Sequence, residues 1–521
     1  MSMVFLKRFF SFFEERFWLQ GILGLGFLCA VYVPALFGHG FADPDAFYHA
    51  KISALLWQQG PIHFFSWLDL SLVGQHFADL HFLFHVLIAP LTALFGMMDG
   101  MRYGMIFLMG MFALIFAWCL RWLEIRFPWV WTILCVSLAP LLIRFSLGKA
   151  SALALMWFVL GITASLKRWP WLLLFVVFGF SLSHGGWMIL VGSVGILCLM
   201  RLLFEAQFEE RVLPLWFRCK TEAPLIFASF IGALCGIAIH PNFPENIRFT
   251  WVQLVTIGLQ TPTDRVLMGK EWMSPSPVQI VSALGPLLIV ALLIGVGFVF
   301  APKKKMNLMY VLPTLQLGSL LAVFVALMML SIRSIEYVIP VFVLFLAFAA
   351  QSVSWKTMIE QQRTMLILGC VLCIFAQSVL LYKALIQLRD RSYPDELYRS
   401  AVQAMRQVGG KVGDRVFHLS FDRFPLLFAQ DDGFRYVSGL DPTFLLVTEP
   451  ELSDRMDAAL RRPKETKSTD WQWMVSSTQA RFVFVPKIGV FQPYLEVLDV
   501  EKGLYRAIFE DEKSKVYQVQ K

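Results

Sequence analysis

The chain has 521 residues, of which 57% are hydrophobic and only 16% are charged, and its mean hydropathy is +0.63. This composition excludes a soluble globular protein, because apolar runs of about twenty residues, the length that crosses a membrane, recur along most of the chain. The net charge of +8 belongs to residues 1–383, since residues 384–521 carry 20 basic and 20 acidic residues. Membrane topology explains this excess better than nucleic-acid binding does.

Eleven apolar stretches predict membrane-spanning helices. We expect them near residues 17–38, 100–121, 129–143, 150–166, 170–183, 185–204, 223–240, 278–300, 307–330, 335–354 and 364–383. A twelfth stretch, residues 81–98, is expected to lie on the outer surface as an interfacial or re-entrant helix. With that assignment the inside loops carry 16 basic residues and the outside loops 9, in agreement with the positive-inside rule. The N-terminus is then cytoplasmic and the C-terminus extracytoplasmic.

The tail, residues 384–521, predicts a separate soluble domain after a membrane domain of residues 1–383. Helical spacing over residues 395–407 is followed by strand-like segments at 416–420, 434–438, 481–485 and 516–519. Further short helices alternate with these segments, which indicates a small α/β domain. All eight cysteines precede residue 384, so no disulfide framework is expected in the tail.

Two aspartates, Asp43 and Asp45, directly follow the first expected span. Carboxylates at the edge of a membrane are costly to desolvate, so they are candidates for chemistry there. A structural role is also open, because Asp is a favoured helix N-cap and Pro44 suits the first helical position. The two roles are compatible, since a capping carboxylate is held in a fixed place. We expect Asp43 to be the catalytic base, with Asp45 as the alternative.

Several other polar residues of the outside loops are candidates for lining a substrate site. His81 and His85 are spaced i, i+4 on an expected helix, near Asp79 and His49, and this pattern suits either a metal or interfacial packing. The remaining candidates are His184 at a tight outside turn, His240 before the loop 241–277, Lys270 and Glu271 in that loop, and Glu336. For the two turn histidines, hydrogen bonding to a turn or a helix end is the alternative role.

An acidic residue directly after the first span resembles the catalytic position of GT-C glycosyltransferases, multispanning enzymes that use lipid-linked sugars. The segment Asp43–Lys51 is similar to an Asp-Pro-aromatic stretch of oligosaccharyltransferase catalytic subunits. The segment Asp79–His85, followed by an apolar run and then Arg102, resembles the juxtamembrane helix and second span of protein O-mannosyltransferases and aminoarabinose transferases. The segments Ser146–Leu155 and Arg333–Pro340 are similar to further substrate-binding and late-helix Arg regions of these families.

The resemblance implies a mainly α, polytopic membrane bundle of GT-C type. About eleven spans and outside juxtamembrane helices would precede the C-terminal soluble α/β domain. It also implies transfer of a sugar from a polyprenyl-phosphate donor to a lipid, glycan or protein acceptor on the outer face of a bacterial inner membrane. A single displacement needs one carboxylate base, Asp43 or Asp45. The donor phosphate would be bound by Arg333, Lys149 and Arg144, for which an interfacial, snorkelling role is the alternative.

Two departures from oligosaccharyltransferases bear on cofactors. The turn Arg144–Lys149 contains no acid where those enzymes have a second acidic motif, and the tail has Trp471-Gln-Trp473 but no Trp-Trp-Asp-Tyr-Gly motif. We therefore expect that no cofactor is required, with a divalent metal, Mg²⁺ or Mn²⁺, as the alternative. Expected partners are the lipid-linked donor, the acceptor and membrane lipids, and no nucleic acid.

Other function classes stay open. One is an oligosaccharyltransferase or glycan ligase that uses a lipid-diphosphate-linked glycan. Another is a lipid or sugar transporter, which acids in outside loops and the absence of a sequence repeat disfavour. The last is a non-catalytic scaffold for envelope-polymer synthesis.

Overall fold

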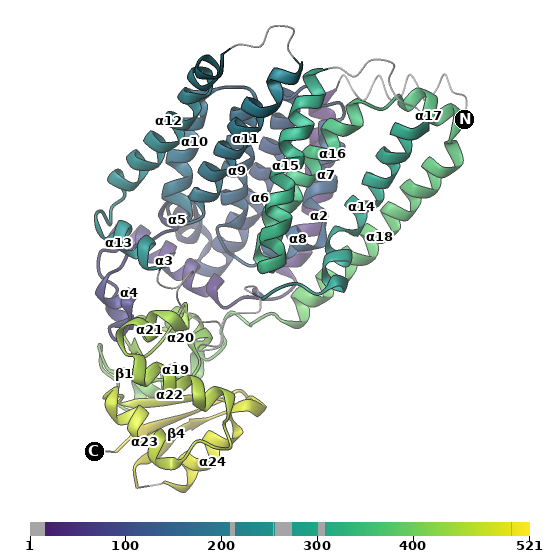
Figure 1. The fold of residues 1–521 in the computed structure, drawn as a ribbon. Coiled ribbons are helices and arrows are strands. Elements are labelled where there is room, and N and C mark those ends of the chain that lie inside the picture. Colours follow the sequence, from purple (N-terminus) through teal and green to yellow (C-terminus); the bar gives the residue numbers. More distant parts are fainter. Residues whose placement is uncertain are drawn as a thin grey trace. The chain divides into compact units, whose positions relative to one another are not determined.

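The computed structural model describes residues 16–208, 214–253, 255, 273–300, 308–501 and 503–520. These residues are mainly helical, with one small sheet toward the C-terminus (Figure 1). Contacts divide the chain into two compact units. We call residues 1–39, 102–238 and 269–391 the helical unit, and residues 40–101, 239–268 and 392–521 the mixed unit.

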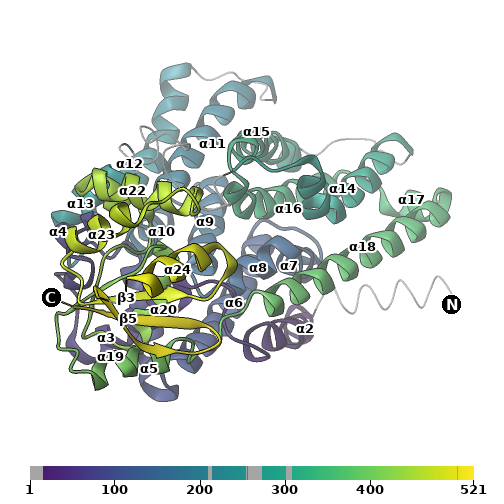
Figure 2. The ribbon, with the colours of Figure 1, turned by 90° about the horizontal axis from the view of Figure 1, so that it is seen from below.

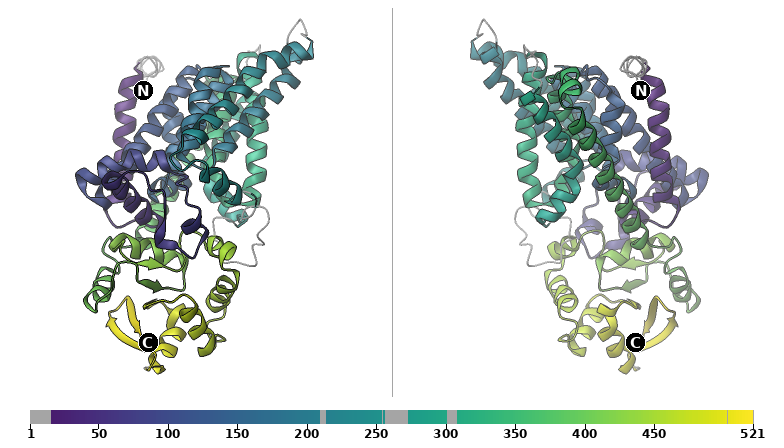
Figure 3. Two further views of the ribbon diagram at one scale, coloured as in Figure 1. Left: turned by 90° about the vertical axis from the view of Figure 1, so that its left-hand side faces the viewer. Right: turned by 90° about the vertical axis from the view of Figure 1, so that its right-hand side faces the viewer.

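The helical unit is a bundle whose long helices run alongside one another in both views of Figure 3. Its helices are α2 (Phe17–Phe37), α6 (Met97–Trp122), α7 (Pro128–Val136), α8 (Ala139–Ser146), α9 (Ser151–Leu166), α10 (Pro170–Ser183), α11 (Trp187–Phe208), α12 (Leu215–Ile239), α14 (Pro277–Phe300), α15 (Leu308–Leu330), the short 3₁₀ helix η4 (Ile332–Ser334), α16 (Ile335–Gln351), α17 (Trp355–Gln361) and α18 (Arg363–Asp390).

The apolar helices confirm a multi-pass membrane protein. Among the described residues, eight helices are long and apolar enough to cross a membrane, and the bent pair α7 and α8 brings the number to nine. The shorter apolar helices α9 and α10 fall at two further predicted spans. On α18 the side chains of Ile367, Leu368 and Phe375 are 51–66% exposed. An apolar surface of this kind is stable in lipid and not in water.

The predicted span at residues 129–143 is wrong in one respect, because it is two helices and not one. Helices α7 and α8 meet at an angle of 68° across residues 137 and 138. Pro140 stands in the first turn of α8, where proline fits a helix start but cannot continue a helix from the preceding turn. The proline was therefore the signal for the break.

The mixed unit combines helices from residues 45–95 and 245–251 with the tail. Residues 81–98 contain the short apolar helix α5, and its predicted interfacial position stays a prediction. The helices are α3 (Asp45–Gln59), η1 (Ser66–Leu68), α4 (Leu72–Gln75), α5 (Phe82–Phe95), α13 (Glu245–Trp251), α19 (Arg399–Gln407), η5 (Phe421–Arg423), α20 (Phe424–Gln430), α21 (Pro442–Thr448), α22 (Pro450–Arg461), α23 (Ser468–Ser477), η6 (Gly489–Phe491) and α24 (Gln492–Val500).

The tail holds a five-stranded sheet of order β2-β1-β3-β5-β4. The strands are β1 (Arg415–Phe417), β2 (Arg435–Tyr436), β3 (Phe482–Pro486), β4 (Tyr505–Glu510) and β5 (Ser514–Val519). Strands β2, β1 and β3 are parallel, and β5 and β4 are antiparallel to their neighbours, with Val416 opposite Phe482 and Val483 opposite Tyr517. The α/β pattern predicted for the tail is confirmed, although β4 was not predicted.

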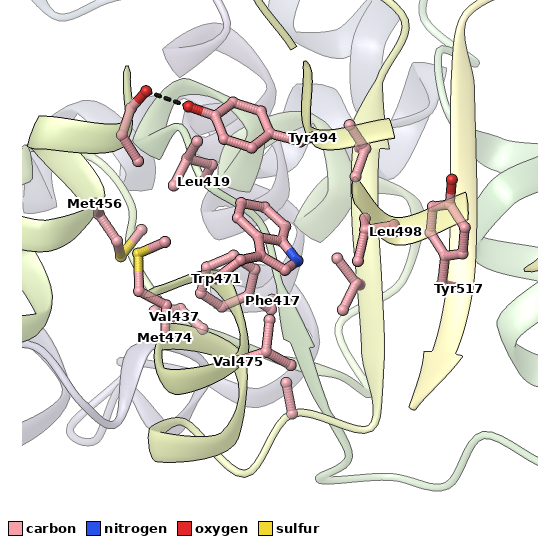
Figure 4. Packing of buried hydrophobic residues seen from close by; sticks show 14 of the residues in the cluster. Phe417, Leu419, Val437, Met456, Trp471, Met474, Val475, Tyr494, Leu498 and Tyr517 are labelled. Carbon is pink, nitrogen blue, oxygen red and sulfur yellow. Dashed lines mark hydrogen bonds between the residues drawn. The ribbon is translucent and has the colours of Figure 1, made fainter. Parts of the chain in front are cut away.

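An aromatic core joins the sheet to the helices α22, α23 and α24 (Figure 4). Trp471 stacks on Tyr494 with ring centroids 4.8 Å apart, and Phe417 of β1 meets the edge of Trp471. The Tyr494 hydroxyl donates to the carbonyl of Ala459. Buried aromatic rings contribute large apolar areas, so this cluster stabilises the tail.

The first loop of the chain is part of the same unit as the tail. Helix α3 packs against both α5 and α20, which lie close to it in Figure 2. Trp67 donates its indole N–H to the carbonyl of Asp432 at 2.6 Å, and Asp69 pairs with Arg415 and Arg435 at 2.8 and 3.0 Å. The sequence-based division at residue 383 stays a prediction, since compactness does not tell which residues lie in a membrane.

Gly40→Ala is expected to destabilise the mixed unit by about 1–3 kcal/mol. A Cβ at Gly40 would lie 1.6 Å from the carbonyl oxygen of Tyr393, whose N–H donates to the carbonyl of Phe41 at 2.9 Å. Thermal unfolding of the purified protein measures the effect. Gly26→Ala is the matched control, because its Cβ would meet nothing within 4 Å. Equal melting temperatures for the two variants would contradict this close pairing.

Candidate active site

The first predicted site residue, Asp43, lies just before helix α3. Its Oδ1 accepts the backbone N–H of Asp45, the first helical residue, at 2.9 Å. The predicted N-cap position is wrong by one residue, because the helix begins at Asp45 and Pro44 is the N-cap. The hydrogen bond to Asp45 still holds the carboxylate at the positive end of the helix dipole. Its catalytic role stays a prediction.

Residues of the tail lie beside Asp43. Burial raises the pKa of Tyr393; a hydrogen bond and the charge of Arg423 act to lower it, and the carboxylates of Asp422 and Asp43 raise it further. Tyr393 is therefore within electrostatic reach of the predicted base, and Arg423 contacts Tyr393. The sequence contained no signal for these two residues, because they follow the first loop by more than 340 positions.

Asp79, His85 and His49 form a buried hydrogen-bonded chain. Nδ1 of His85 lies 2.7 Å from Oδ2 of Asp79, and Nε2 of His85 lies 2.8 Å from Nδ1 of His49. His85 is fully buried, and Asp79 and His49 are 7% and 5% exposed. The expected proximity of these residues is confirmed, and the three side chains bond to one another.

The turn at residues 240–242 holds Asp79 in position. Nε2 of His240 donates to the backbone carbonyl of Asp79 at 3.0 Å, and the Asp79 N–H donates to Oδ1 of Asn242 at 3.2 Å. Nδ1 of His240 accepts the N–H of Asn242, so the ring is neutral with its proton on Nε2. Burial lowers the pKa of His240, although Asp79 acts to raise it, and this agrees with a neutral ring. His240 thus has the turn-bonding role that was its alternative.

His81 and Tyr48 complete this group. The ring of His81 meets the edge of the His49 ring at a centroid distance of 5.1 Å, and the backbone N–H of His81 donates to Oδ1 of Asp79. His81 precedes α5 and does not lie within it. Burial raises the pKa of Tyr48 well above its usual value, and the carboxylates of Asp79 and Asp45 raise it further. Both carboxylates are therefore close to the same ring.

The residues of this group do not fit a divalent metal. Within the ranges that the structure describes, no set of three or more His, Cys, Asp or Glu side chains is arranged to hold one. The oxygens of Asp79 already bond His81 and His85, and His85 bonds a second imidazole through its other nitrogen. The expected alternative of Mg²⁺ or Mn²⁺ therefore enters no step proposed below.

A second group of predicted residues lies in the helical unit. Arg144, near the end of α8, pairs through Nε with Glu336 of α16 at 3.0 Å, and the side chains are 12% and 5% exposed. The predicted alternative for Arg144, a side chain snorkelling to the interface, is therefore replaced by a buried ion pair. Such a pair is strongly destabilising to break, because the remaining charge stays buried.

His184 lies in the turn between α10 and α11, within electrostatic reach of Arg333 and Arg144. Burial, together with these two guanidinium groups, lowers the pKa of His184 to about 3. The N–H of Gly186 donates to its Nδ1 at 2.9 Å, so the neutral ring carries its proton on Nε2. This group therefore presents the charge of arginines and a neutral N–H donor, which suits an anion.

Of the three remaining predicted residues, Lys149, Lys270 and Glu271, the structure describes only Lys149. Lys149 is half-buried in the turn between α8 and α9, next to Gly148 with a φ of +70°. Lys270 and Glu271 lie outside the described residues. The predicted residues that are described divide between the two units: Asp43, Asp45, His49, Asp79, His81, His85 and His240 belong to the mixed unit, and Arg144, Lys149, His184, Arg333 and Glu336 to the helical unit.

Comparison with known proteins relates the fold to solved structures. No family model matches the chain, and no curated protein sequence does. An apo oligosaccharyltransferase from Archaeoglobus fulgidus matches with a TM-score of 0.59 and 11% identity, covering 91% of this chain and 70% of that chain. ArnT from Cupriavidus metallidurans, bound to undecaprenyl phosphate, matches with a TM-score of 0.54 and 13% identity, covering 96% and 98%. The arabinofuranosyltransferase AftD from mycobacteria matches at 0.57 and 12%, covering 98% and 40%.

The chain shares the fold of these structures, the GT-C fold. The predicted fold class is thereby confirmed, including the small sheet of the tail. At 10–13% identity the matches establish the GT-C fold and not the reaction. The matched structures include proteins in complex with dolichol-phosphate and with undecaprenyl phosphate. One structure of the archaeal enzyme contains zinc and sulfate.

Proposed function

We propose that the protein transfers a sugar from a polyprenyl-phosphate donor to an acceptor hydroxyl on the outer face of a bacterial inner membrane. The observation that carries this proposal is the pair Asp43 and Asp45 at the start of α3, directly after the first apolar helix of a GT-C fold. The hydrogen bond to the α3 N-terminus fixes the position of Asp43, and fixed carboxylates are effective bases.

The reaction is a single displacement. The carboxylate of Asp43, or of Asp45 if Asp43 serves only to bond the start of α3, removes the proton of the acceptor hydroxyl. The acceptor oxygen then bonds to the anomeric carbon, and the bond from that carbon to the phosphate oxygen breaks with its electron pair leaving on the phosphate. One carboxylate suffices for this step, and the anomeric configuration inverts.

The leaving phosphate is assigned to the group around Arg333. Arginine binds phosphate bidentately, and a neutral His184 donates an N–H without repelling the guanidinium groups. Arg144 pairs with Glu336 through Nε, and we assign Arg333 as the principal binding residue and Lys149 as a supplementary charge. The remaining predicted residues, including Lys270 and Glu271, stay candidates for lining the substrate site.

The alternative is transfer of a whole glycan from a lipid diphosphate. This alternative is supported by the match to the archaeal oligosaccharyltransferase AglB, at a TM-score of 0.60. That structure is a complex with dolichol-phosphate and an inhibitory peptide. The absence of an acid from the turn Arg144–Lys149 disfavours it. A lipid or sugar transporter would move its substrate without forming a new glycosidic bond, and a scaffold would do neither.

A transfer assay tests the proposal. The purified protein in lipid nanodiscs is incubated separately with undecaprenyl-phosphate-linked glucose, mannose, N-acetylglucosamine and aminoarabinose, each radiolabelled, together with a bacterial envelope extract. We expect label to leave one lipid phosphate and to appear in a glycoside of inverted configuration. Transfer only from a lipid diphosphate would support the glycan ligase. Label that stays lipid-linked with every donor would contradict the transferase.

Arg333→Ala is expected to raise the KM for the lipid-phosphate donor by about 10- to 100-fold. A charge-assisted hydrogen bond to an ionised group contributes about 1.5–3 kcal/mol, and each 1.4 kcal/mol is tenfold in affinity. Arg333→Lys keeps the charge and is expected to lose less affinity, because lysine cannot bind the phosphate bidentately. A KM unchanged in both variants would remove Arg333 from the phosphate site.

The proposed orientation has its own test. We infer a cytoplasmic N-terminus and an extracytoplasmic tail, so Lys303–Lys305 would face the cytoplasm. A single cysteine at position 304 should then resist a membrane-impermeant thiol reagent in intact cells, in a variant whose native cysteines are replaced. A cysteine at exposed Val412 of the tail should react. The reverse pattern would place the tail in the cytoplasm.

A further inference from the structure

The chain Asp79–His85–His49 has no role in the reaction as written above. Its two contacts, 2.7 Å from Asp79 to His85 and 2.8 Å from His85 to His49, are short enough for strong hydrogen bonds. Burial of titratable side chains is unfavourable unless each has a partner, and here each does. The arrangement extends the carboxylate–imidazole pair of many enzymes by a second imidazole.

The carboxylate of Asp79 sets the direction of the hydrogen bonds. Burial acts to raise the pKa of Asp79, but His85 and His81 outweigh it and hold the pKa below its usual value. An ionised carboxylate only accepts, so Nδ1 of His85 carries a proton. In a neutral His85 the other nitrogen, Nε2, then accepts the Nδ1 proton of His49. In this arrangement Nε2 of His49 is the nitrogen of that ring that carries no proton.

His49, at the basic end of this chain, lies on α3, whose first residue is Asp45, the alternative base, while Asp43 lies two residues before Asp45. His49 follows Asp45 by four residues on α3, and side chains at this spacing are neighbours on one helix face. The Cα–Cβ bond of His49 is tilted toward the N-terminus of α3. Asp79 and Asp45 also lie near the same tyrosine, Tyr48. Both ends of the chain are therefore close to the start of α3.

We propose that Asp79, His85 and His49 form a proton relay. The relay removes the proton that the carboxylate base takes up in each sugar transfer. The relay rests on the proposed function, because the proton it carries comes from the acceptor hydroxyl. The O–H bond of the carboxylic acid at the start of α3 breaks, an N–H bond forms at Nε2 of His49, and the carboxylate is restored. The positive charge is shared with His85 and balanced by Asp79. His49 later releases the proton to water.

Among the residues that the structure describes, the charged and titratable groups that contact the relay come from three segments of the mixed unit. They are Asp45 and Tyr48 on α3, His81 before α5, and His240 after α12. His240 donates to the backbone of Asp79 and stays neutral, so it adds no charge. Asp45 and Asp79 supply negative charge on either side, which favours an imidazolium between them.

Nuclear magnetic resonance tests the relay without any substrate. In protein with ¹⁵N-labelled histidine in nanodiscs, we expect a protonated Nδ1 on His85 and an N–H···N hydrogen bond between His49 and His85. His85→Phe removes one set of signals and assigns it. An unprotonated Nδ1 on His85, or no coupling between the two rings, would overturn the relay whatever the enzyme's activity.

Kinetics test its use. Asp79→Asn keeps the shape and an acceptor oxygen but removes the charge, so we expect kcat to fall about tenfold or more while the donor KM stays within about twofold. Loss of this negative charge disfavours the imidazolium form of His85 and His49, so the acidic limb of kcat should move to lower pH. His49→Ala should lose activity and regain part of it with added imidazole. His76→Ala, which removes a surface pair with Glu245, is the control and should leave the profile unchanged.

The outcomes separate the two proposals. If the wild-type protein transfers sugar but Asp79→Asn keeps the wild-type acidic limb and imidazole does not rescue His49→Ala, the relay is wrong and the transferase stands. If the wild-type protein transfers no sugar from any donor, the proposed function is wrong. The proposed relay is then also wrong, because it carries the proton of the acceptor hydroxyl. A shifted limb and imidazole rescue in a transferring enzyme would establish the relay.

Discussion

Asp43→Asn is expected to reduce sugar transfer by about 100-fold or more while the protein still inserts into the membrane. Asparagine keeps the side-chain oxygen that accepts the N–H of Asp45, so the hydrogen bond at the start of α3 is preserved. It cannot remove a proton from the acceptor, and loss of a general base costs about 10²- to 10⁴-fold. The rate of label transfer in nanodiscs measures the effect.

Asp45→Asn is the matched variant for this experiment. If Asp43 is the base, Asp45→Asn should retain most of its activity, since the hydrogen bond to Asp43 does not use its side chain. If Asp45 is the base, Asp45→Asn should lose activity by about 100-fold or more and Asp43→Asn should retain most of it. Full activity in both variants would remove the base from this segment and with it the mechanism proposed here.

Glu222→Gln is expected to lower the free energy of unfolding by about 3–5 kcal/mol, the largest stability effect we expect. Glu222 pairs with Arg201 and Arg168 at 2.9 Å each, and the side chains of Glu222 and Arg201 are 4% and 3% exposed. Removal of the carboxylate leaves the guanidinium of Arg201 buried without its counter-ion. Thermal unfolding in detergent, with intrinsic fluorescence as the readout, measures the loss.

Two further variants make this prediction specific. Glu124→Gln removes a partner of the more exposed pair with Lys167 and should change stability by no more than about 1 kcal/mol. The double variant Glu222→Leu with Arg201→Met removes both buried charges and should recover much of the stability. If Glu222→Gln alone is as stable as the wild type, the network is not what holds these helices together.

The membrane helices were predictable because lipid imposes one simple requirement, a long apolar helix. The expected span at residues 17–38 is α2, Phe17–Phe37, and the expected span at 307–330 is α15, Leu308–Leu330. The break between α7 and α8 was missed because hydropathy is insensitive to the backbone, although Pro140 marked it. The continuous apolar run of a strand that is buried on both faces was also readable, as β3 at Phe482–Pro486 shows.

The candidate site was predictable as a list of residues and not as an arrangement. Chemistry-bearing residues near span ends can be recognised from their cost of burial, as with Asp43 and Arg333. Their hydrogen bonds depend on contacts between distant segments. The bond between His49 and His85, and the contact of Tyr393 with the first loop, follow from packing that no local spacing encodes.

The composition of the mixed unit from three separate chain segments has a consequence for biosynthesis. Trp67 and its partner Asp432 are 365 residues apart, and a ribosome that adds about 5–20 residues per second needs roughly 20–70 s to synthesise that interval. Throughout this time Phe65 and Trp67 lack the aromatic ring of Phe428 against which they pack in the finished protein. The loop that holds Phe65 and Trp67 must therefore be shielded from aggregation, by the membrane or by a chaperone, until the chain has been made as far as Asp432.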